Sequence, residues 1–268
     1  QQQQQQQPVV LFLPGGAFLI GYKMWAALFA QALSTFDVLV ISADYRNYPF
    51  GTVPDMIEDV EDVIQWTLDH CHEYGGNPDK VVVVGQSAGA HLGMMALLLR
   101  QKKKKRNTIK GFIGLSGIFD LSDACDLYAR HGLSKAFVEE KLFDNQRNNC
   151  DPIQVVETSS PDAMMENLPP IEIWHGTADK TVDWRSSKAF ASKLEQSCNT
   201  HVRFQSYPHF THTDPIIETI FEGNHVLHYD ICHCIEEWCN VTLDFEPPSS
   251  SPRCPRLMVQ LARRFSPF

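Results

Sequence analysis

Short apolar runs alternate along this chain with longer segments in which apolar and polar residues recur at helical spacing. Residues 56–68 place apolar side chains mostly at three- and four-residue steps, with acidic residues opposite, which predicts an amphipathic helix. Residues 88–99 are nearly all small or apolar, as expected of a helix buried behind a central strand. Six apolar runs predict β-strands: residues 9–13, 38–43, 81–84, 112–115, 171–174 and 202–204. Because these strands are apolar and alternate with helices, we expect a doubly wound, mostly parallel α/β sheet covered on both faces.

Several segments depart from this alternation and divide the chain. Residues 1–7 are a low-complexity glutamine tail, and residues 246–268 form a tail rich in Pro, Ser and Arg, expected to be loose apart from one short helix near 257–263. Residues 8–245 are expected to form one α/β domain. Within it, residues 119–167 show no strand pattern, so we expect a helical, lid-like excursion at one end of the sheet. Residues 101–106, with four consecutive lysines, predict a solvated turn.

Composition narrows the classes of protein. The chain has 268 residues, of which 43% are hydrophobic, enough for a full core. A net charge of −9 argues against nucleic acid as a partner, because an acidic surface repels phosphate groups. The eight cysteines do not show the spacing of a disulfide framework, so reduced thiols are expected. No signal peptide opens the chain, and glycines, Pro14 and Lys23 interrupt the apolar stretch at 8–32, so no membrane span is predicted.

Ser87 is the candidate nucleophile. It stands in Gly85-Gln86-Ser87-Ala88-Gly89, directly after the strand at 81–84 and at the start of the buried helix. A sharp strand-to-helix turn forces a serine into a strained conformation that exposes its Oγ, and the flanking glycines avoid collisions with neighbouring backbone. A glycine-rich structural turn is the alternative interpretation.

Backbone N–H groups that could stabilise an oxyanion are expected beside Ser87. Gly15, Gly16 and Ala17 follow the first strand at the same edge of the sheet. Small residues let their N–H groups point inward, and with the N–H of Ala88 they would form an oxyanion hole. An ordinary tight turn is the alternative.

A nucleophilic serine needs a histidine base and an acid that orients it. In a fold of this type the order along the chain is serine, acid, histidine, each after a later strand. Asp179 follows the strand at 171–174 and is the predicted acid, with Asp183, otherwise a helix-capping aspartate, as its rival. His212 follows the strand at 202–204 and is the predicted base, with His209 of the same loop as its competitor.

A cysteine and histidine cluster near the end of the chain raises the question of a metal. Cys232, Cys234 and Cys239 lie close to His225, His228 and His233. The Cys-x-Cys spacing has no matching second pair at the distance typical of a zinc finger. Residues 226–238 instead have the pattern of an amphipathic helix, so we predict a helix and no metal site.

Taken together, these motifs resemble those of the isoprenylcysteine alpha-carbonyl methylesterases, a branch of the α/β-hydrolase superfamily related to hormone-sensitive-lipase-like esterases. The matching segments run in order from about residue 9 to residue 222: Gly15-Gly16-Ala17 with Gly21-Tyr22-Lys23, Asp44-Tyr45-Arg46-Asn47-Tyr48-Pro49, Glu73-Tyr74-Gly75-Gly76-Asn77-Pro78, Gly85-Gln86-Ser87-Ala88-Gly89-Ala90-His91, Gly114-Leu115-Ser116-Gly117, His175-Gly176-Thr177-Ala178-Asp179 and Thr211-His212-Thr213-Asp214. The segment 21–23 and the loop 211–214 narrow the resemblance to this branch.

The resemblance implies the α/β-hydrolase fold, beginning at what that fold counts as its third strand and so without the usual leading strands. It implies Ser87, Asp179 and His212 as a catalytic triad and no cofactor. It further implies contacts to the carbonyl oxygen from the backbone of 15–17 and of Ala88, with Gln86 lining the site. The implied reaction is hydrolysis of the methyl ester on a prenylated C-terminal cysteine. The implied location is the cytosolic side of endoplasmic reticulum and Golgi membranes, with peripheral association.

A prenyl chain needs an apolar groove, which Phe18, Met24, Trp25 and residues of the 119–167 excursion could line; plain core packing is the alternative for each. Two other functions stay open from the sequence. One is a hydrolase of small esters or amides, similar to kynurenine formamidase, with the same elbow and triad. The other is a non-catalytic binding protein on the same fold, against which the presence of serine, acid and histidine argues.

Overall fold

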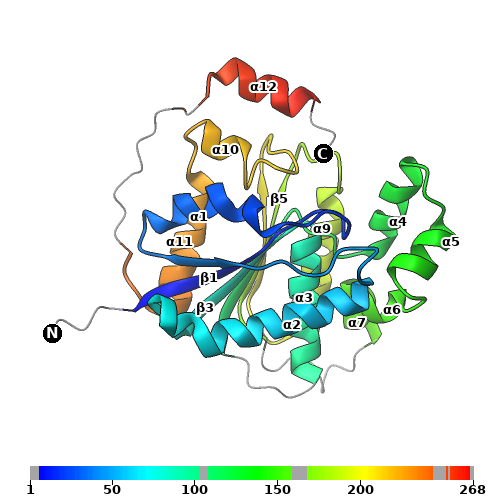
Figure 1. Ribbon diagram of the computed structural model, residues 1–268, viewed down its shortest axis with the longest axis horizontal. Helices are drawn as coiled ribbons and strands as arrows, with labels where there is room; N and C mark the ends of the chain where they lie inside the picture. Colours follow the sequence, from blue (N-terminus) through cyan, green and yellow to red (C-terminus); the bar gives the residue numbers. More distant parts are fainter. Residues whose placement is uncertain (1–5, 103–107, 159–167, 244–251, 253, 266–268) are drawn as a thin grey trace.

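A sheet of parallel strands forms the centre of the protein (Figure 1). The computed structural model describes residues 6–102, 108–158, 168–243, 252 and 254–265. The six strands lie in the order β2-β1-β3-β4-β5-β6, and every pair of neighbours is parallel. Their bounds are β1 (Gln7–Leu13), β2 (Leu39–Ser42), β3 (Gly76–Gln86), β4 (Ile109–Leu115), β5 (Ile171–Gly176) and β6 (Val202–Tyr207). The predicted parallel α/β sheet is confirmed.

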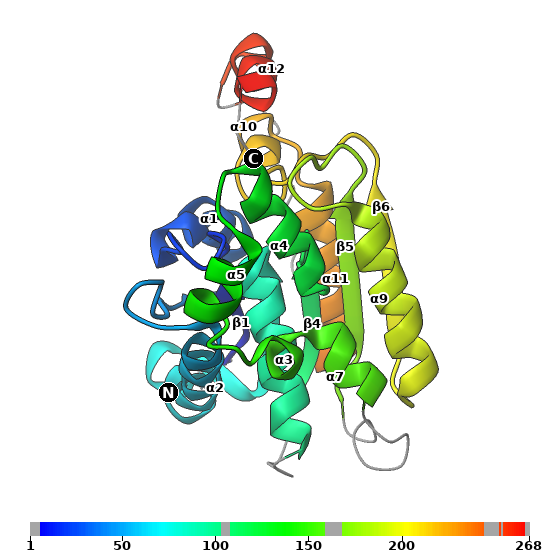
Figure 2. The ribbon, with the colours of Figure 1, turned by 90° about the vertical axis from the view of Figure 1, so that its right-hand side faces the viewer.

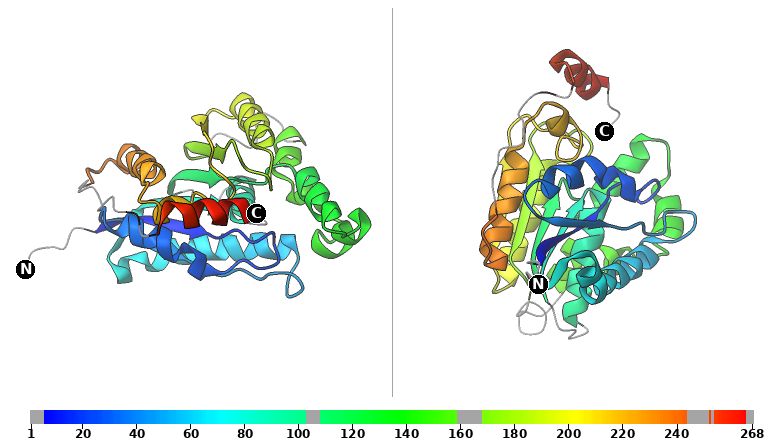
Figure 3. Two further views of the ribbon diagram at one scale, coloured as in Figure 1. Left: turned by 90° about the horizontal axis from the view of Figure 1, so that it is seen from above. Right: turned by 60° about the vertical axis from the view of Figure 1, so that its left-hand side comes forward.

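Helices cover both faces of this sheet. Helices α1 (Ala27–Ser34) and α11 (Val226–Cys239) lie on one face, and α2 (Val53–His70), α3 (Ala88–Lys102) and α9 (Trp184–Ser197) lie on the other (Figures 1 and 3). Residues 9–13 of strand β1 are all apolar because their alternate side chains enter different cores. Val9 and Leu11 pack in the core shared with α2 and α3, whereas Val10 and Phe12 pack in the core shared with α1 and α11.

The order of the strands places a topological switch point between β1 and β3. The chain passes from β1 through α1 to β2 on one face, and from β2 through α2 to β3 on the other. The loops that leave the carboxyl ends of β1 and β3 therefore diverge to opposite faces, and ligands of parallel sheets bind at such points. These two loops carry residues 14–18 and Ser87.

Helix α2 illustrates how the sequence pattern dictates local structure. Thr52 and Asp55 form a capping box at its start, in which the Asp55 carboxylate accepts a hydrogen bond from the Thr52 N–H at 2.8 Å. Pro54 lies in the first turn, where its missing N–H costs nothing. The apolar stripe then faces the core, with Met56, Ile57, Val60 and Ile64 all buried. The predicted amphipathic helix is confirmed.

The segment between β4 and β5 is helical as far as it is described (Figure 2). The elements are α4 (Leu121–Arg130), α5 (Lys135–Phe137), a π-helical turn η3 (Val138–Leu142), α6 (Arg147–Cys150) and α7 (Pro152–Thr158). Residues 159–167, which complete the expected excursion, lie outside the described part of the chain.

Short helices complete the rest of the chain. They are η1 (Lys23–Ala26), η2 (Cys71–Tyr74), α10 (Glu218–Phe221) and α12 (Arg256–Phe265). Helix α12 covers the short helix expected near 257–263, but it is tied to the domain by Arg263, which differs from the expected loose tail. Most of the solvated turn expected at 101–106 lies outside the described residues, starting at the side chain of Lys102. Residues 1–5 and most of 244–253 also lie outside them. Among the helices that are described, none is long and apolar enough to cross a membrane.

Candidate active site

Ser87 occupies the turn between β3 and α3 in a left-handed backbone conformation, with φ of 53°. The two glycines of its motif are required by close backbone contacts. A Cβ at Gly85 would lie 2.5 Å from the carbonyl oxygen of Gly89, and a Cβ at Gly89 would lie 2.1 Å from that of Leu13. The turn therefore has the sharp, crowded geometry that presents a serine Oγ at the carboxyl edge of a sheet.

His212 lies between Ser87 and Asp179 and contacts both. Its Nε2 is 2.9 Å from Ser87 Oγ, and its Nδ1 is 2.7 Å from Asp179 Oδ2. In a neutral imidazole with the proton on Nδ1, that N–H donates to the carboxylate and Nε2 accepts from the serine hydroxyl. The structure thus brings together the three residues that the sequence singled out, from loops after β3, β5 and β6.

The Asp179 carboxylate is buried among hydrogen-bond donors. Its Oδ1 accepts from the N–H groups of Thr181 and Val182 at 2.8 and 3.0 Å, and its Oδ2 also lies 3.0 Å from Nε2 of His175. Burial alone would disfavour the charged carboxylate. Its interactions with His212 and His175 outweigh burial and hold the pKa of Asp179 well below its usual range. Asp179 is therefore ionised at any pH near neutrality and can orient an imidazole.

The two competing residues lie elsewhere. Asp183 caps α9, where its carboxylate accepts from the N–H of Arg185 at 3.0 Å and is about half exposed. His209 is exposed, and the contact the structure gives it is a hydrogen bond from its backbone N–H to Thr177 Oγ1. Neither side chain is part of the hydrogen-bonded chain that starts at Ser87.

The loop after β1 lies directly against Ser87. A Cβ added at Gly15 would be 2.9 Å from the Ser87 Cβ and 2.2 Å from the Gln86 side chain. Among the residues that the structure describes, the backbone N–H groups of Gly16, Ala17 and Ala88 have no protein acceptor. Unpaired donors next to a serine Oγ are what an oxyanion hole requires.

Gln86 is buried and its side chain points across the site. Its Nε2 donates to the backbone carbonyl of His212 at 3.1 Å, across 126 positions of sequence. The residue expected to line the site therefore also holds the loop of the histidine in place. Of the apolar residues expected to form a groove, Phe18 is fully buried against His91, whereas Met24 and Trp25 are exposed by 55% and 38%. Phe18 is thus core, which is the alternative weighed for it.

Three residues of this site were not assigned roles from the sequence. His175 contacts Asp179, Tyr45 donates its hydroxyl to the Pro14 carbonyl at 2.8 Å, and Tyr128 donates to the Ala17 carbonyl. His175 and Tyr45 stand in motifs quoted for the family resemblance, which was the available signal. Tyr128 belongs to the excursion and has no such motif.

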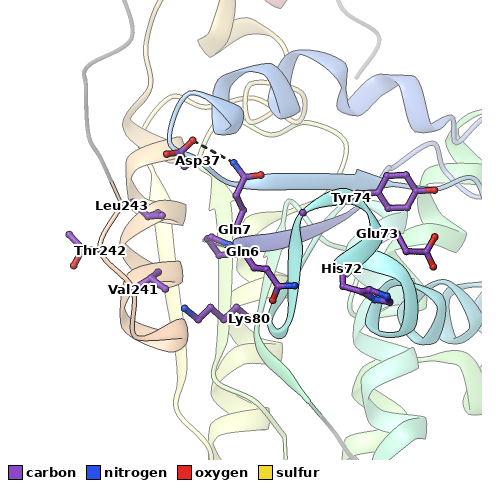
Figure 4. A pocket seen from close by; sticks show the side chains of 12 residues that line it. Gln6, Gln7, Asp37, His72, Glu73, Tyr74, Lys80, Val241, Thr242 and Leu243 are labelled. Carbon is purple, nitrogen blue, oxygen red and sulfur yellow. Dashed lines mark hydrogen bonds between the residues drawn. The ribbon is translucent and has the colours of Figure 1, made fainter. Parts of the chain in front are cut away.

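A separate hollow lies far from this site (Figure 4). It has a volume of about 1050 Å³ and is lined mostly by polar residues, among them Gln7, His72, Glu73 and Lys80. Gln7 begins β1, and residues 72–75 directly precede β3, so the hollow opens at the amino edge of the sheet. Ser87 follows the other end of the 11-residue strand β3, roughly 30 Å away at the usual rise per residue. None of the triad residues lines this hollow.

The late cysteine and histidine cluster lies on helix α11 (Val226–Cys239), with His225 at its N-cap, which confirms the helix predicted for it. Within the described residues, no group of three or more His, Cys, Asp or Glu side chains is arranged to hold a metal ion. Burial lowers the pKa of His228 to about 3, so this histidine is a neutral core residue at physiological pH.

Comparison with known proteins agrees with this geometry. The sequence profile of the BD-FAE family matches residues 1–194, which is most of the chain. The chain belongs to the BD-FAE family. This is an α/β-hydrolase esterase family, so the family resemblance inferred from the motifs is confirmed.

Relatives of this BD-FAE chain carry the name expected from the motifs. It is 31% identical to the isoprenylcysteine alpha-carbonyl methylesterase ICME of Arabidopsis thaliana, across 97% of this chain and 64% of that protein. It is also 31% identical to a probable isoprenylcysteine alpha-carbonyl methylesterase ICME of Oryza sativa subsp. japonica, across 97% of this chain and 66% of the relative. The chain therefore spans somewhat less than two thirds of these relatives.

Solved esterase structures share the fold of this BD-FAE chain. Esterase 2 of Thermogutta terrifontis with propionate bound superposes with a TM-score of 0.65 at 21% identity, covering 90% of this chain and 85% of the other. A hyperthermophilic esterase of Pyrobaculum calidifontis gives a TM-score of 0.70 at 19% identity, covering 88% and 77%. The predicted α/β-hydrolase fold is confirmed.

Proposed function

We propose that this protein is a serine carboxylesterase that uses Ser87, His212 and Asp179 as its catalytic triad. One observation carries the proposal: an unbroken chain of contacts from Ser87 Oγ through His212 to the ionised Asp179, at 2.9 and 2.7 Å. The unpaired N–H groups of Gly16, Ala17 and Ala88 beside that serine supply the second element of acyl transfer.

In the proposed reaction, His212 Nε2 removes the Ser87 proton as Oγ attacks the ester carbonyl carbon. The carbonyl oxygen becomes an oxyanion, which the backbone N–H groups beside it stabilise by hydrogen bonds. The imidazolium then gives its proton to the departing alkoxide, and the alcohol leaves an acyl-enzyme on Ser87. A water molecule, deprotonated by His212, attacks the acyl carbonyl, and the acid is released as Ser87 regains its proton.

We further propose that the ester is the methyl ester of a prenylated C-terminal cysteine, so that the alcohol released is methanol. This finer proposal is supported by the names of the relatives from Arabidopsis and rice and by the motifs shared with that branch. Exposed apolar side chains close in sequence to the oxyanion loop, those of Met24 and Trp25, are available to contact a prenyl chain. The location at endoplasmic reticulum and Golgi membranes stays a prediction from the resemblance.

The test compares farnesylcysteine methyl ester with a short-chain nitrophenyl ester, for the wild type and for Ser87→Ala. We expect preference for the prenylated ester, with both activities lost in the variant. Cleavage of the short ester alone would reject the prenylcysteine substrate while supporting a small-substrate esterase or amidase. Absence of both activities from the folded wild type would favour a binding protein and reject the esterase itself.

A further inference from the structure

The oxyanion loop has an unusual backbone. Gly16, Ala17 and Phe18 follow one another with positive φ angles of 131°, 51° and 62°. The left-handed region is sterically unfavourable for residues that carry a Cβ, and two adjacent ones require support from their surroundings. The conformation of this loop is therefore set by contacts with the rest of the protein and not by its own preference.

Those contacts hold the carbonyl groups of the loop. Gly16 O accepts hydrogen bonds from the N–H groups of Leu19 and Ile20, at 2.9 and 3.0 Å. Phe18 O accepts from the N–H of Tyr48, in the segment between β2 and α2, at 3.0 Å. The carbonyls at the two ends of the donor-bearing segment, those of Pro14 and Ala17, are held by side chains instead.

Two buried tyrosine hydroxyls provide this support. Tyr45, on the segment between β2 and α2, donates to Pro14 O at 2.8 Å and approaches Gly15 O at 3.5 Å. Tyr128, on α4 of the excursion, donates to Ala17 O. Burial raises the pKa of both phenols far above neutrality, so each hydroxyl keeps the proton that it donates.

Holding a carbonyl fixes an N–H group as well. A peptide unit is planar, and its C=O and the N–H of the following residue point in opposite directions. Tyr45 restrains the units on either side of Gly15, and Tyr128 restrains the unit that follows Ala17. The Gly16 N–H shares its peptide unit with Gly15 O, and the Ala17 N–H shares its unit with Gly16 O, which the N–H groups of Leu19 and Ile20 hold. Tyr128 acts on the Ala17 N–H from the adjoining unit, because fixing the Ala17 carbonyl restrains rotation at the Ala17 Cα.

We propose that Tyr128 is a positioning residue, through which the docking of α4 keeps the oxyanion hole in its active conformation, and that Tyr45 supports the opposite end of the same loop. The inference rests on the proposed function, because only an acyl-transfer enzyme forms the oxyanion. It gives the excursion a part in positioning the site: displacement of α4 removes the support of the Ala17 carbonyl and loosens the hole.

The experiment replaces each hydroxyl while retaining the ring. Tyr128→Phe and Tyr45→Phe are compared with wild type on a short-chain nitrophenyl ester, well below the melting temperature of each variant. Loss of one buried hydrogen bond that acts on the transition state predicts a fall in kcat of about tenfold, with KM nearly unchanged. Tyr207→Phe is the matched control, since it removes a buried hydroxyl that donates, at 2.6 Å, to Asp230 on α11. Its kcat should stay within about twofold of wild type.

A merely structural role for Tyr128 would lower the melting temperature and leave kcat unchanged. The corresponding thiono ester separates the two further, because sulfur accepts hydrogen bonds poorly and gains less from the hole. The ratio of ester to thiono ester rates should therefore fall in Tyr128→Phe and stay constant in Tyr207→Phe. If kcat and the ratio of ester to thiono ester rates are unchanged in Tyr128→Phe and Tyr45→Phe, while activity still depends on Ser87, this inference alone is overturned. A wild type that hydrolyses no ester would overturn the proposed function as well.

Discussion

Arg263 binds the carboxylate of Asp214 through two hydrogen bonds, 2.6 Å from Nη2 and 3.0 Å from Nε to Oδ1. Asp214 is fully buried and lies two residues after His212. Its other oxygen accepts from the N–H and the hydroxyl of Thr211, at 2.6 and 2.9 Å. The loop of the candidate base is therefore tied to α12 near the end of the chain, and Arg263 also pairs with Glu222.

Arg263→Ala should destabilise the protein and lower its activity, because it leaves the Asp214 carboxylate buried without its cation. Removing one partner of a buried ion pair costs 3–5 kcal/mol in general; since Arg263 is partly exposed, we expect about 2–3 kcal/mol of unfolding free energy here. Arg263→Lys keeps the charge but not the paired geometry, and should fall between. Denaturant unfolding measures both effects.

The control for this prediction is Arg185→Ala. Arg185 pairs with Asp183 on the surface at 3.2 Å, with both side chains more than half exposed. Exposed pairs contribute little, so its loss should cost less than about 1 kcal/mol. Equal losses in the two variants would contradict a tether between α12 and the histidine loop.

Asp179→Asn should lower kcat by about 10⁴ while the protein stays folded, because an amide at this position favours the wrong tautomer of His212. Asp183→Asn is the matched variant, four residues further along. It keeps a side-chain oxygen to cap α9 and loses only the exposed ion pair with Arg185, so stability should change by less than about 1 kcal/mol and kcat should stay close to wild type. Steady-state kinetics on a short ester decide between them, and a large loss at Asp183 instead would reassign the acid.

The two histidines of the 209–212 loop should differ in the same way. His212→Ala removes the proposed base and should lower kcat by about 10⁶, as in triads that act as a unit. His209→Ala removes an exposed side chain and should change kcat by less than about twofold. Comparable losses in both variants would mean that His209 takes part in proton transfer.

The contribution of two buried histidines to stability should fall as the pH is lowered from about 6.5 towards 4. Burial lowers the pKa of His91 to about 4 and that of His228 to about 3, whereas an unfolded histidine titrates near 6.5. In this window the unfolded chain binds protons that the folded protein does not, so acid favours unfolding. His228→Leu should lose about 2 kcal/mol less stability than wild type between pH 7 and pH 5.

Denaturant unfolding at the two pH values measures this difference. His131→Leu, on the exposed turn after α4, is the control and should follow the wild type. A His228→Leu variant with the same loss of stability as wild type would show that the buried imidazole is not responsible.

Much of the fold follows from local patterns. The apolar run at 81–84 identified the centre of β3, and the glycines around Ser87 identified the turn, because backbone crowding there excludes any side chain. The ends of the strands were harder to predict. Strand β3 extends back to Gly76, through residues with no strand pattern, because its pairing with β1 begins at Gln7. Pairing partners, and not local preference, set that boundary.

The supporting contacts of the site could not be predicted from the sequence. Tyr128 and Ala17 are 111 residues apart, and Arg263 is 49 residues from Asp214. Each contact depends on how a helix outside the central sheet packs against a loop. Neither Tyr128 nor Arg263 belongs to a motif. The residues proposed to perform the chemistry carry local signatures, whereas those that hold them are specified only by the packed fold.

Covalent trapping of Ser87 tests the central claim most directly. The folded protein is treated with a fluorophosphonate, and peptide mass spectrometry locates the adduct in wild type, Ser87→Ala and Ser116→Ala, the last a variant of another buried serine with positive φ. The account predicts stoichiometric modification of Ser87 in wild type and in Ser116→Ala, and none in Ser87→Ala. An unmodified Ser87 in folded wild type, or an adduct that persists in Ser87→Ala, would contradict it.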